Sequence, residues 1–131
     1  MKLIVIDAGV WVRMARSILA EPLILRCKIY ELVPVLNNYL LAEVHDALLK
    51  NKWATIRQAD VFVNYMKESS LFVTENAVYR LSPDPKDNYL FDLAVQSNCA
   101  FIISDDTDLL SFALQPVEVK SCNWFLKQFP V

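Results

Sequence analysis

The sequence predicts one α/β domain over residues 1–131, built on a central parallel sheet with helices on both faces. Short apolar runs alternate with amphipathic segments along the whole chain, as they do in successive strand–helix–strand units. The two clearest runs, 3–6 and 100–103, are apolar throughout, as expected of strands buried on both faces. No repeat, low-complexity segment or linker divides the chain.

The first half of the chain is predicted to alternate strands with helices. Its elements are a strand at 3–6, a helix from Val10 or Trp11 to Leu19, a short helix at 23–30, a strand at 32–35, a helix from Asn37 or Asn38 to about Lys50, and a helix at 53–68. Asp7 ends the first strand, and Glu21-Pro22 interrupts the helical pattern. Pro34 lacks an N–H, which favours a sheet edge or a strand end for 32–35. The last of these helices is expected to turn inward Ile56, Ala59, Phe62, Val63 and Met66.

The second half continues the same alternation. Its elements are short strands at 71–73 and 78–80, a helix from an Asp84 cap to about Ser97, a central strand at 100–103, a helix that opens at 105–108 and runs through Ala113, an edge strand at 117–120, and a helix from a Ser121 cap to Gln128. Asp84-Pro85 is a strong helix start because aspartate caps the first turn and proline suits the first helical position. Ser104 or Asp105 is the expected cap of the helix after the central strand.

A single glycine among 131 residues, where roughly nine would be average, excludes every motif built on a glycine-rich loop. There is no dinucleotide fingerprint, no P-loop and no nucleophile elbow. A protein of this composition that handles phosphate must therefore use side chains or metal ions. The net charge of −2 is too balanced to indicate a broad nucleic-acid footprint, although it leaves room for a local one.

The three cysteines are widely spaced, and His45 is the single histidine, so a cysteine/histidine zinc site is not expected. Reduced thiols favour a reducing compartment. Asp7 interrupts the apolar N-terminal run, so we expect no signal peptide. The longest uncharged stretch, 93–104, falls short of the roughly 20 residues that a membrane span needs. These features predict a soluble, cytoplasmic protein.

Acidic residues follow both of the clearest strands: Asp7 after the first, and Asp105, Asp106 and Asp108 after the central one. If the two strands are neighbours, these acids meet at the carboxyl edge of the sheet, where α/β proteins bind ligands. Glu43 lies at the margin of a helix's apolar stripe. Asp87 lies in the first turn of its helix, in line with the apolar positions that follow.

Carboxylates that converge at one edge repel one another unless a cation lies among them. Oxygen ligands favour Mg²⁺ or Mn²⁺, and such ions can promote attack on a phosphodiester. Each acid taken alone also has a structural interpretation as a turn residue or helix cap. Capping does not explain Asp7 together with Glu43, so the joint pattern favours a metal site.

Two further features of the first predicted helix have alternative interpretations. Arg13 and Arg16 could contact an RNA backbone or form a solvated face, and Trp11 could stack on a base or lie in the core.

The order of these segments resembles the PIN-domain family, and most of all its bacterial toxins of toxin–antitoxin pairs. The segments are the first strand with Asp7, Leu40-Leu41-Ala42-Glu43-Val44, Asp84-Pro85-Lys86-Asp87-Asn88, and Ile102 to Leu110. The resemblance covers nearly the whole chain. It implies a three-layer α/β/α sandwich and a Mg²⁺- or Mn²⁺-dependent endoribonuclease. RNA would be its substrate and an antitoxin protein its partner.

The resemblance also assigns residues. Asp7, Glu43, Asp87 and Asp106 would form the catalytic, metal-holding quartet, Asp108 an auxiliary acid on the metal side, Asp84 the helix cap, and Asp105 a solvent-facing residue. The fifteen aromatic residues are many for a small domain, which predicts that some lie on a homodimer or antitoxin surface.

The chain departs from the family after the first aspartate, where Ala8 and Gly9 replace the usual hydroxyl residue and asparagine. Gly9 either permits an unusual backbone turn or marks a site that is losing its function. The alternative to an active nuclease is therefore a catalytically weakened RNA-binding or protein-interaction domain. A phosphotransfer domain with Asp7 as nucleophile ranks last because Asp7-Ala8-Gly9 supplies no second acid.

Overall fold

The computed structural model describes residues 1–16, 20–74 and 85–131, with the side chains of 1–16, 23–74 and 89–131. Over these residues the strands form one sheet in the order β3-β2-β1-β4-β5, and every pair is parallel. The elements are β1 (Lys2–Ile6), α1 (Ala8–Arg16), α2 (Ala20–Ile29), β2 (Leu32–Leu36), α3 (Asn38–Lys50), α4 (Ile56–Glu68), β3 (Leu71–Phe72), α5 (Pro85–Gln96), β4 (Ile102–Ile103), α6 (Thr107–Leu110), β5 (Val119–Lys120) and α7 (Cys122–Gln128).

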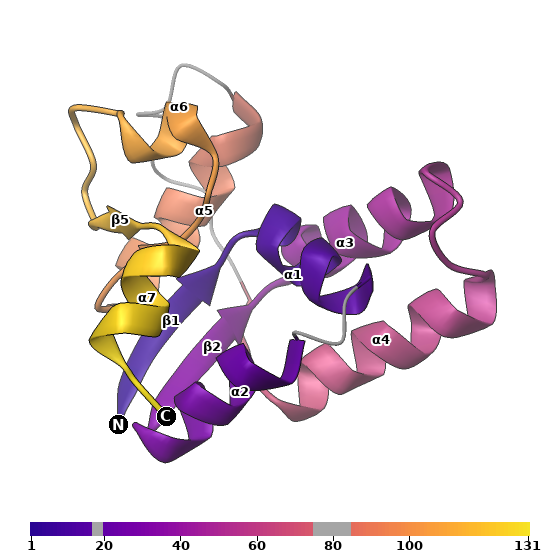
Figure 1. The fold of residues 1–131 in the computed structure, drawn as a ribbon. Helices are drawn as coiled ribbons and strands as arrows, with labels where there is room; N and C mark the ends of the chain where they lie inside the picture. Colours follow the sequence, from indigo (N-terminus) through magenta and orange to yellow (C-terminus); the bar gives the residue numbers. More distant parts are fainter. Residues whose placement is uncertain (17–19, 75–84) are drawn as a thin grey trace.

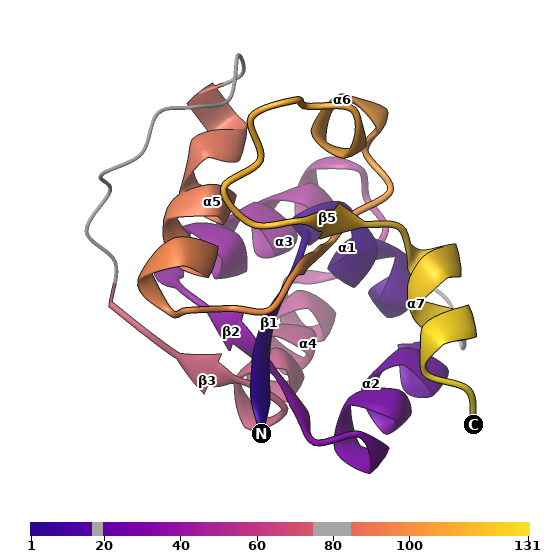
Figure 2. The same ribbon diagram turned by 90° about the vertical axis from the view of Figure 1, so that its left-hand side faces the viewer.

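Helices cover both faces of the sheet, as predicted. Helix α5 packs on β1 and β2 from one side, whereas α2 and α7 lie on the other side (Figure 2). Helix α1 packs against α2 and α3, and α3 packs against α4. Helices α1 and α3 follow the carboxyl ends of β1 and β2 directly (Figure 1). The predicted α/β architecture with a central parallel sheet is therefore confirmed.

The core is centred on β1, whose residues Ile4, Val5 and Ile6 are fully buried. Trp11, on the first helix, is also fully buried and packs edge-on against Phe62 of α4. The core interpretation of Trp11 is thus correct, and base stacking by its ring is excluded. None of the helices in the described ranges is long and apolar enough to cross a membrane.

The prediction that Pro34 marks an edge or a strand end was wrong, because β2 lies between β1 and β3 and Pro34 pairs with Ile4 in its middle. Alternation along the strand explains how the proline is accepted. Leu36 turns its carbonyl toward β3, where it accepts from Val73 N–H at 2.8 Å, so Pro34 faces the same side. Strand β3 begins only opposite Val35, and the missing N–H of Pro34 therefore has no ladder partner to lose.

Several element boundaries also differ from the prediction. Helix α2 begins at Ala20, so Pro22 lies in its first turn, where a proline removes no helical hydrogen bond. Ile56 is 68% exposed rather than inward, because it is the first residue after the Thr55 cap. Helix α6 ends at Leu110, and its cap is Asp106 rather than Ser104 or Asp105. The predicted strand at 78–80 and the Asp84 cap lie outside the described residues.

The sequence left two asparagines as candidate caps of α3, and the structure selects Asn37. Its buried side chain accepts a hydrogen bond from Leu40 N–H at 2.9 Å, whereas Asn38 is exposed in the first turn. The capped helix carries Glu43 toward the carboxyl edge of the sheet, so this cap helps to place a candidate site residue.

We therefore expect Asn37→Ala to lower the free energy of unfolding by about 1–2 kcal/mol, since it leaves a helix N–H without its acceptor. The matched control Asn38→Ala should change it by less than about 0.5 kcal/mol. Urea denaturation followed by circular dichroism measures both. Equal effects of the two substitutions would show that the Asn37 cap does not stabilise α3.

Candidate active site

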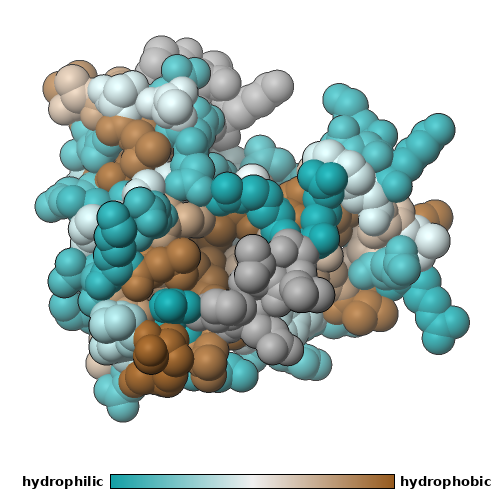
Figure 3. Space-filling view, viewed as in Figure 1, coloured by the Kyte–Doolittle hydropathy of each residue, from teal (hydrophilic) through white to brown (hydrophobic). Residues whose placement is uncertain are grey.

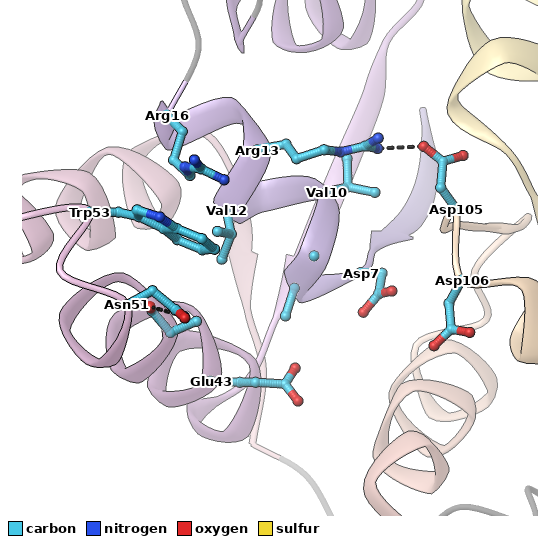
Figure 4. Close-up of a pocket in the computed structure, with 13 residues that line it drawn as sticks. Asp7, Val10, Val12, Arg13, Arg16, Glu43, Asn51, Trp53, Asp105 and Asp106 are labelled. Carbon is cyan, nitrogen blue, oxygen red and sulfur yellow. Dashed lines mark hydrogen bonds and ion pairs between the residues drawn. The ribbon is translucent and has the colours of Figure 1, made fainter.

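A pocket of about 590 Å³ opens at the carboxyl edge of the sheet. Three parts of the chain line it: the segment from Asp7 to Arg16, the segment from Glu43 to Trp53 on α3 and just after it, and the loop that carries Asp105 and Asp106. The carboxylates of Asp7, Glu43 and Asp106 all turn into it (Figure 4). Acids that are far apart in the sequence thus share one cavity of a size that ordinary ligands fill.

The pairing of β1 with β4 brings Asp7 and Asp106 to the same place. Ile6 pairs with Ile103, and Asp7 N–H donates to the Ile103 carbonyl at 2.9 Å. The two strands are therefore neighbours and end at the same level. The acids that follow them meet at one edge, as the sequence predicted for neighbouring strands.

Asp7 is the most constrained of these acids. Its Oδ2 accepts from the Ser104 hydroxyl at 2.7 Å. Burial raises the pKa of the Asp7 carboxyl above its usual value, and the nearby charge of Asp106 adds to the rise, although the hydrogen bonds from Ser104 and from the Ala8 and Gly9 N–H groups oppose it. A carboxylate in these surroundings is stabilised by a bound cation.

Ser104 is a site residue that the sequence analysis did not assign. It is fully buried, and its Oγ donates to Asp7 while it accepts from Asp106 N–H at 3.1 Å. One hydroxyl thus orients both acids, and it supplies Asp7 with a side-chain donor that Ala8 lacks. The available signal was its position, directly after a buried strand and two residues before an aspartate.

Asp106 has a double role. Its Oδ1 accepts from Asp108 N–H at 2.9 Å and so caps the short helix α6. Figure 4 shows its carboxylate facing the pocket that Asp7 also lines. Asp108 contributes this backbone N–H, while its exposed side chain is not among the pocket's lining residues.

Glu43 approaches the pocket from α3, opposite the strand ends (Figure 4). Its Oε2 accepts from the Tyr89 hydroxyl at 2.6 Å, so α5 orients a carboxylate that α3 carries. Sequence periodicity placed Glu43 at the margin of the packed face but gave no sign of Tyr89, because the contact joins two separate helices. Asp87 is the third residue of the same helix α5, and its side chain lies outside the described part.

Asp105 is exposed, as the resemblance implied, but its carboxylate also has partners within the protein. It pairs with Arg13 of α1, and it accepts from Cys122 N–H at 2.9 Å. Burial alone would raise the pKa of the Asp105 carboxyl, but the hydrogen bonds from Cys122 and Arg13 outweigh it and lower the pKa. The loop between β4 and α6 is thereby tied to α1 and to the start of α7. Arg13 thus has an acidic partner, although its side chain stays 57% exposed.

Gly9 has an ordinary helical backbone. Within the described chain, no glycine has a positive φ angle, and a Cβ added to Gly9 would meet nothing within 4 Å. The hypothesis that this glycine permits an unusual turn was therefore wrong. The Cβ of a larger residue would therefore meet no neighbour at position 9.

The donor set fits a divalent cation of the Mg²⁺ or Mn²⁺ type. Asp7, Glu43 and Asp106 offer only carboxylate oxygens, which such ions prefer over the nitrogen and sulfur ligands of zinc. Among the described side chains, no three acids, histidines or cysteines are close enough to hold a metal as they stand. The described cysteines, Cys27, Cys99 and Cys122, are free thiols.

Replacing Asp7 by asparagine should stabilise the protein at neutral pH. The pKa of the Asp7 carboxyl is raised in the folded state above its usual value of 3.8. Ionisation of Asp7 therefore disfavours folding as the pH rises past 3.8. We expect Asp7→Asn to melt at a higher temperature than wild type at pH 7, and the difference to shrink as pH falls toward 4. Thermal melts across this range without divalent ions test it. A lower melting temperature for the variant at pH 7 would contradict the prediction.

Comparison with known proteins agrees with this geometry. The PIN domain family model matches residues 3–108, which span every acid of the candidate site. A search of curated proteins found no match. PIN domains are typically nucleases that need a divalent metal. With the family match covering most of the sequence and the parallel sheet bringing Asp7 and Asp106 to one edge, the chain belongs to the PIN-domain family.

Proposed function

We propose that this protein is an endoribonuclease that depends on Mg²⁺ or Mn²⁺, and that it is the toxin of a toxin–antitoxin pair. The observation that carries the nuclease proposal is the shared orientation of Asp7, Glu43 and Asp106 into one pocket (Figure 4). Three separate parts of the chain supply these acids. Asp106 caps α6, and Asp7 accepts hydrogen bonds from the Ala8 and Gly9 N–H groups at the start of α1, but capping does not explain Glu43, which lies within α3.

The four acids Asp7, Glu43, Asp87 and Asp106 would hold the metal, with Asp108 as an auxiliary acid. A divalent ion supplies Lewis-acid chemistry that activates water and stabilises a leaving oxygen of the phosphodiester. The protein's part is to hold these ligands in orientation. The Ser104 hydroxyl donates to Asp7, and the Tyr89 hydroxyl donates to Glu43, so each carboxylate presents its remaining oxygen lone pairs to the pocket.

The basic side chains on the same pocket would guide RNA to this edge. Arg13 and Arg16 both line the pocket from α1, one helical turn apart, and arginine is well suited to phosphate contacts. Arg13 reaches the acidic end through its ion pair with Asp105. Arg16 lies farther along the pocket (Figure 4).

We expect the protein to cut a circular single-stranded RNA, which has no ends, in Mg²⁺ or Mn²⁺ but not in EDTA. Asp7→Asn and Asp106→Asn should each lower the cleavage rate by at least about a hundredfold, because loss of a direct ligand exceeds the 10–100-fold effect of outer residues. Asp46→Asn is the matched control, since Asp46 is exposed on α3 and outside the pocket. Gel electrophoresis of the products measures all three.

Cleavage at the wild-type rate by both site variants would place the reaction elsewhere. Calorimetric titration with Mn²⁺ separates the nuclease from the alternative, a weakened PIN domain that only binds RNA or protein. The nuclease requires Mn²⁺ binding near neutral pH that is lost in Asp7→Asn. A wild-type protein that binds no Mn²⁺ favours the alternative.

Apolar side chains that reach the surface support a partner or homodimer interface. Leu25 and Ile29 of α2 are 46% and 53% exposed, and Leu126 of α7 is 39% exposed. Arg26 Nε donates to the Phe129 carbonyl at 2.8 Å, which joins α2 to the C-terminal segment. Figure 3 shows hydrophobic side chains gathered over this part of the molecule. Such a patch is typical of protein contacts.

For the toxin role, we expect that expressing the wild-type chain arrests bacterial growth and that Asp7→Asn does not. A small DNA-binding protein encoded upstream of the gene should relieve the arrest when it is co-expressed. Sedimentation of the purified chain tests the homodimer. Normal growth on expression of an active nuclease would contradict the toxin role, and a monomer throughout the micromolar range would contradict the homodimer.

A further inference from the structure

The pocket has a second end, away from the acids, that is built from an aromatic ring and a guanidinium group. Trp53 lies between α3 and α4 and is 43% exposed. The guanidinium carbon of Arg16 lies 3.7 Å from the centre of the Trp53 ring. Figure 4 shows this pair at one end of the pocket and Asp7, Glu43 and Asp106 toward the other. Arg13 lies between the two ends.

Hydrogen bonds in the turn after α3 hold Trp53 in this exposed position. Asn51 Nδ2 donates to the Ala47 carbonyl at 2.8 Å, and Trp53 N–H donates to the Leu48 carbonyl at 3.0 Å. Lys52 adopts a φ angle of 57°, which is uncommon for a residue with a side chain. The turn after α3 is thus tightly bonded, and it presents the indole to the pocket instead of burying it.

The other two tryptophans pack against other aromatic rings. Trp11 is fully buried in the core. Trp124 packs edge-on against Phe101 and Phe129 at ring-centre distances of 5.2 and 6.1 Å. Only Trp53 of the three lines the pocket that the acids share. Its exposure in that pocket therefore suggests a ligand-binding use.

We propose that Trp53 and Arg16 form a base-binding subsite, where an unpaired base of single-stranded RNA stacks while a neighbouring phosphate reaches the acidic end. This inference rests on the proposed nuclease function and names its substrate class. Aromatic rings and arginine planes are the usual stacking partners of splayed RNA bases. Duplex RNA keeps its bases stacked within the helix, so it cannot offer one to this surface.

The charges along the pocket agree with this orientation of the RNA. Arg13 is paired with Asp105, whereas none of the carboxylates in the described ranges pairs with Arg16. Arg16 can therefore stack on Trp53 and still attract a phosphate. The acidic end would repel RNA without a metal, which leaves the Trp53 end as the part of the pocket that binds RNA in the metal-free protein.

The test is binding of a labelled single-stranded RNA decamer to the full chain in EDTA, measured by fluorescence anisotropy. Trp53→Leu should weaken binding about tenfold, within the range found for loss of one stacked base. Trp53→Phe keeps an aromatic face and should stay within about threefold of wild type. A blunt duplex of the same sequence should bind all three proteins equally.

Tryptophan fluorescence provides a second measurement that a purely structural role would not change. The decamer should quench the tryptophan fluorescence of the wild-type protein and of the control variant Trp124→Phe. This quenching should be lost in Trp53→Phe. If circular dichroism shows that Trp53→Leu does not fold, the fluorescence quenching and the RNA affinity of Trp53→Phe still test the proposed subsite. The proposal is wrong if wild type does not bind the decamer, if quenching persists in Trp53→Phe, or if a folded Trp53→Leu binds as wild type does.

Binding in EDTA requires no cleavage, so failures of the two proposals can be told apart. If the protein cleaves RNA in a metal-dependent way but binds the decamer independently of Trp53, the subsite proposal is wrong and the nuclease proposal stands. Trp53-dependent binding without cleavage in Mg²⁺ or Mn²⁺ would overturn the nuclease and leave an RNA-binding pocket. Binding of a protein partner that Trp53→Leu abolishes, with decamer affinity unchanged, would assign the surface to that partner instead.

Discussion

The parallel pairing of β1 with β4 is the interaction on which the candidate site depends. It joins residues almost a hundred positions apart and ends with Asp7 N–H bonded to the Ile103 carbonyl. That bond sets Asp7 level with the residues after Ile103, so Ser104 can bond both Asp7 and Asp106. A slip of this register by one residue would turn every side chain of the shifted strand to the opposite face and separate the acids.

The resulting proximity creates an electrostatic problem that the surrounding residues only partly offset. Burial and the charge of Asp106 both raise the pKa of the Asp7 carboxyl, while hydrogen bonds from Ser104 and from the N–H groups of Ala8 and Gly9 lower it. The net shift is upward, so the charged form is disfavoured in the metal-free protein. A cation in the pocket would remove this penalty, and the same property thus links stability to metal binding.

Asp105 and Asp106 show how neighbouring residues can take opposite roles. Asp105 turns toward Arg13 and Cys122 and ties the loop to α1 and α7. Asp106 turns toward the pocket and caps α6. Arg13 is paired with Asp105, whereas Arg16 stacks on the Trp53 ring and pairs with no carboxylate of the described residues. The pocket therefore has the carboxylates of Asp7, Glu43 and Asp106 toward one end and the Arg16–Trp53 pair at the other.

The sequence alone was sufficient to predict the α/β class, nearly every strand and helix, and the acids that follow β1 and β4. These features follow from local apolar patterning and helix capping, which neighbouring residues determine. Tertiary structure decided what depends on distant contacts: the interior position of β2 despite Pro34, the choice of Asn37 as the cap of α3, and the burial of Trp11. It also revealed that Ser104 and Tyr89 orient Asp7 and Glu43. Those hydrogen bonds join separate elements, and one-dimensional periodicity carries no information about which elements meet.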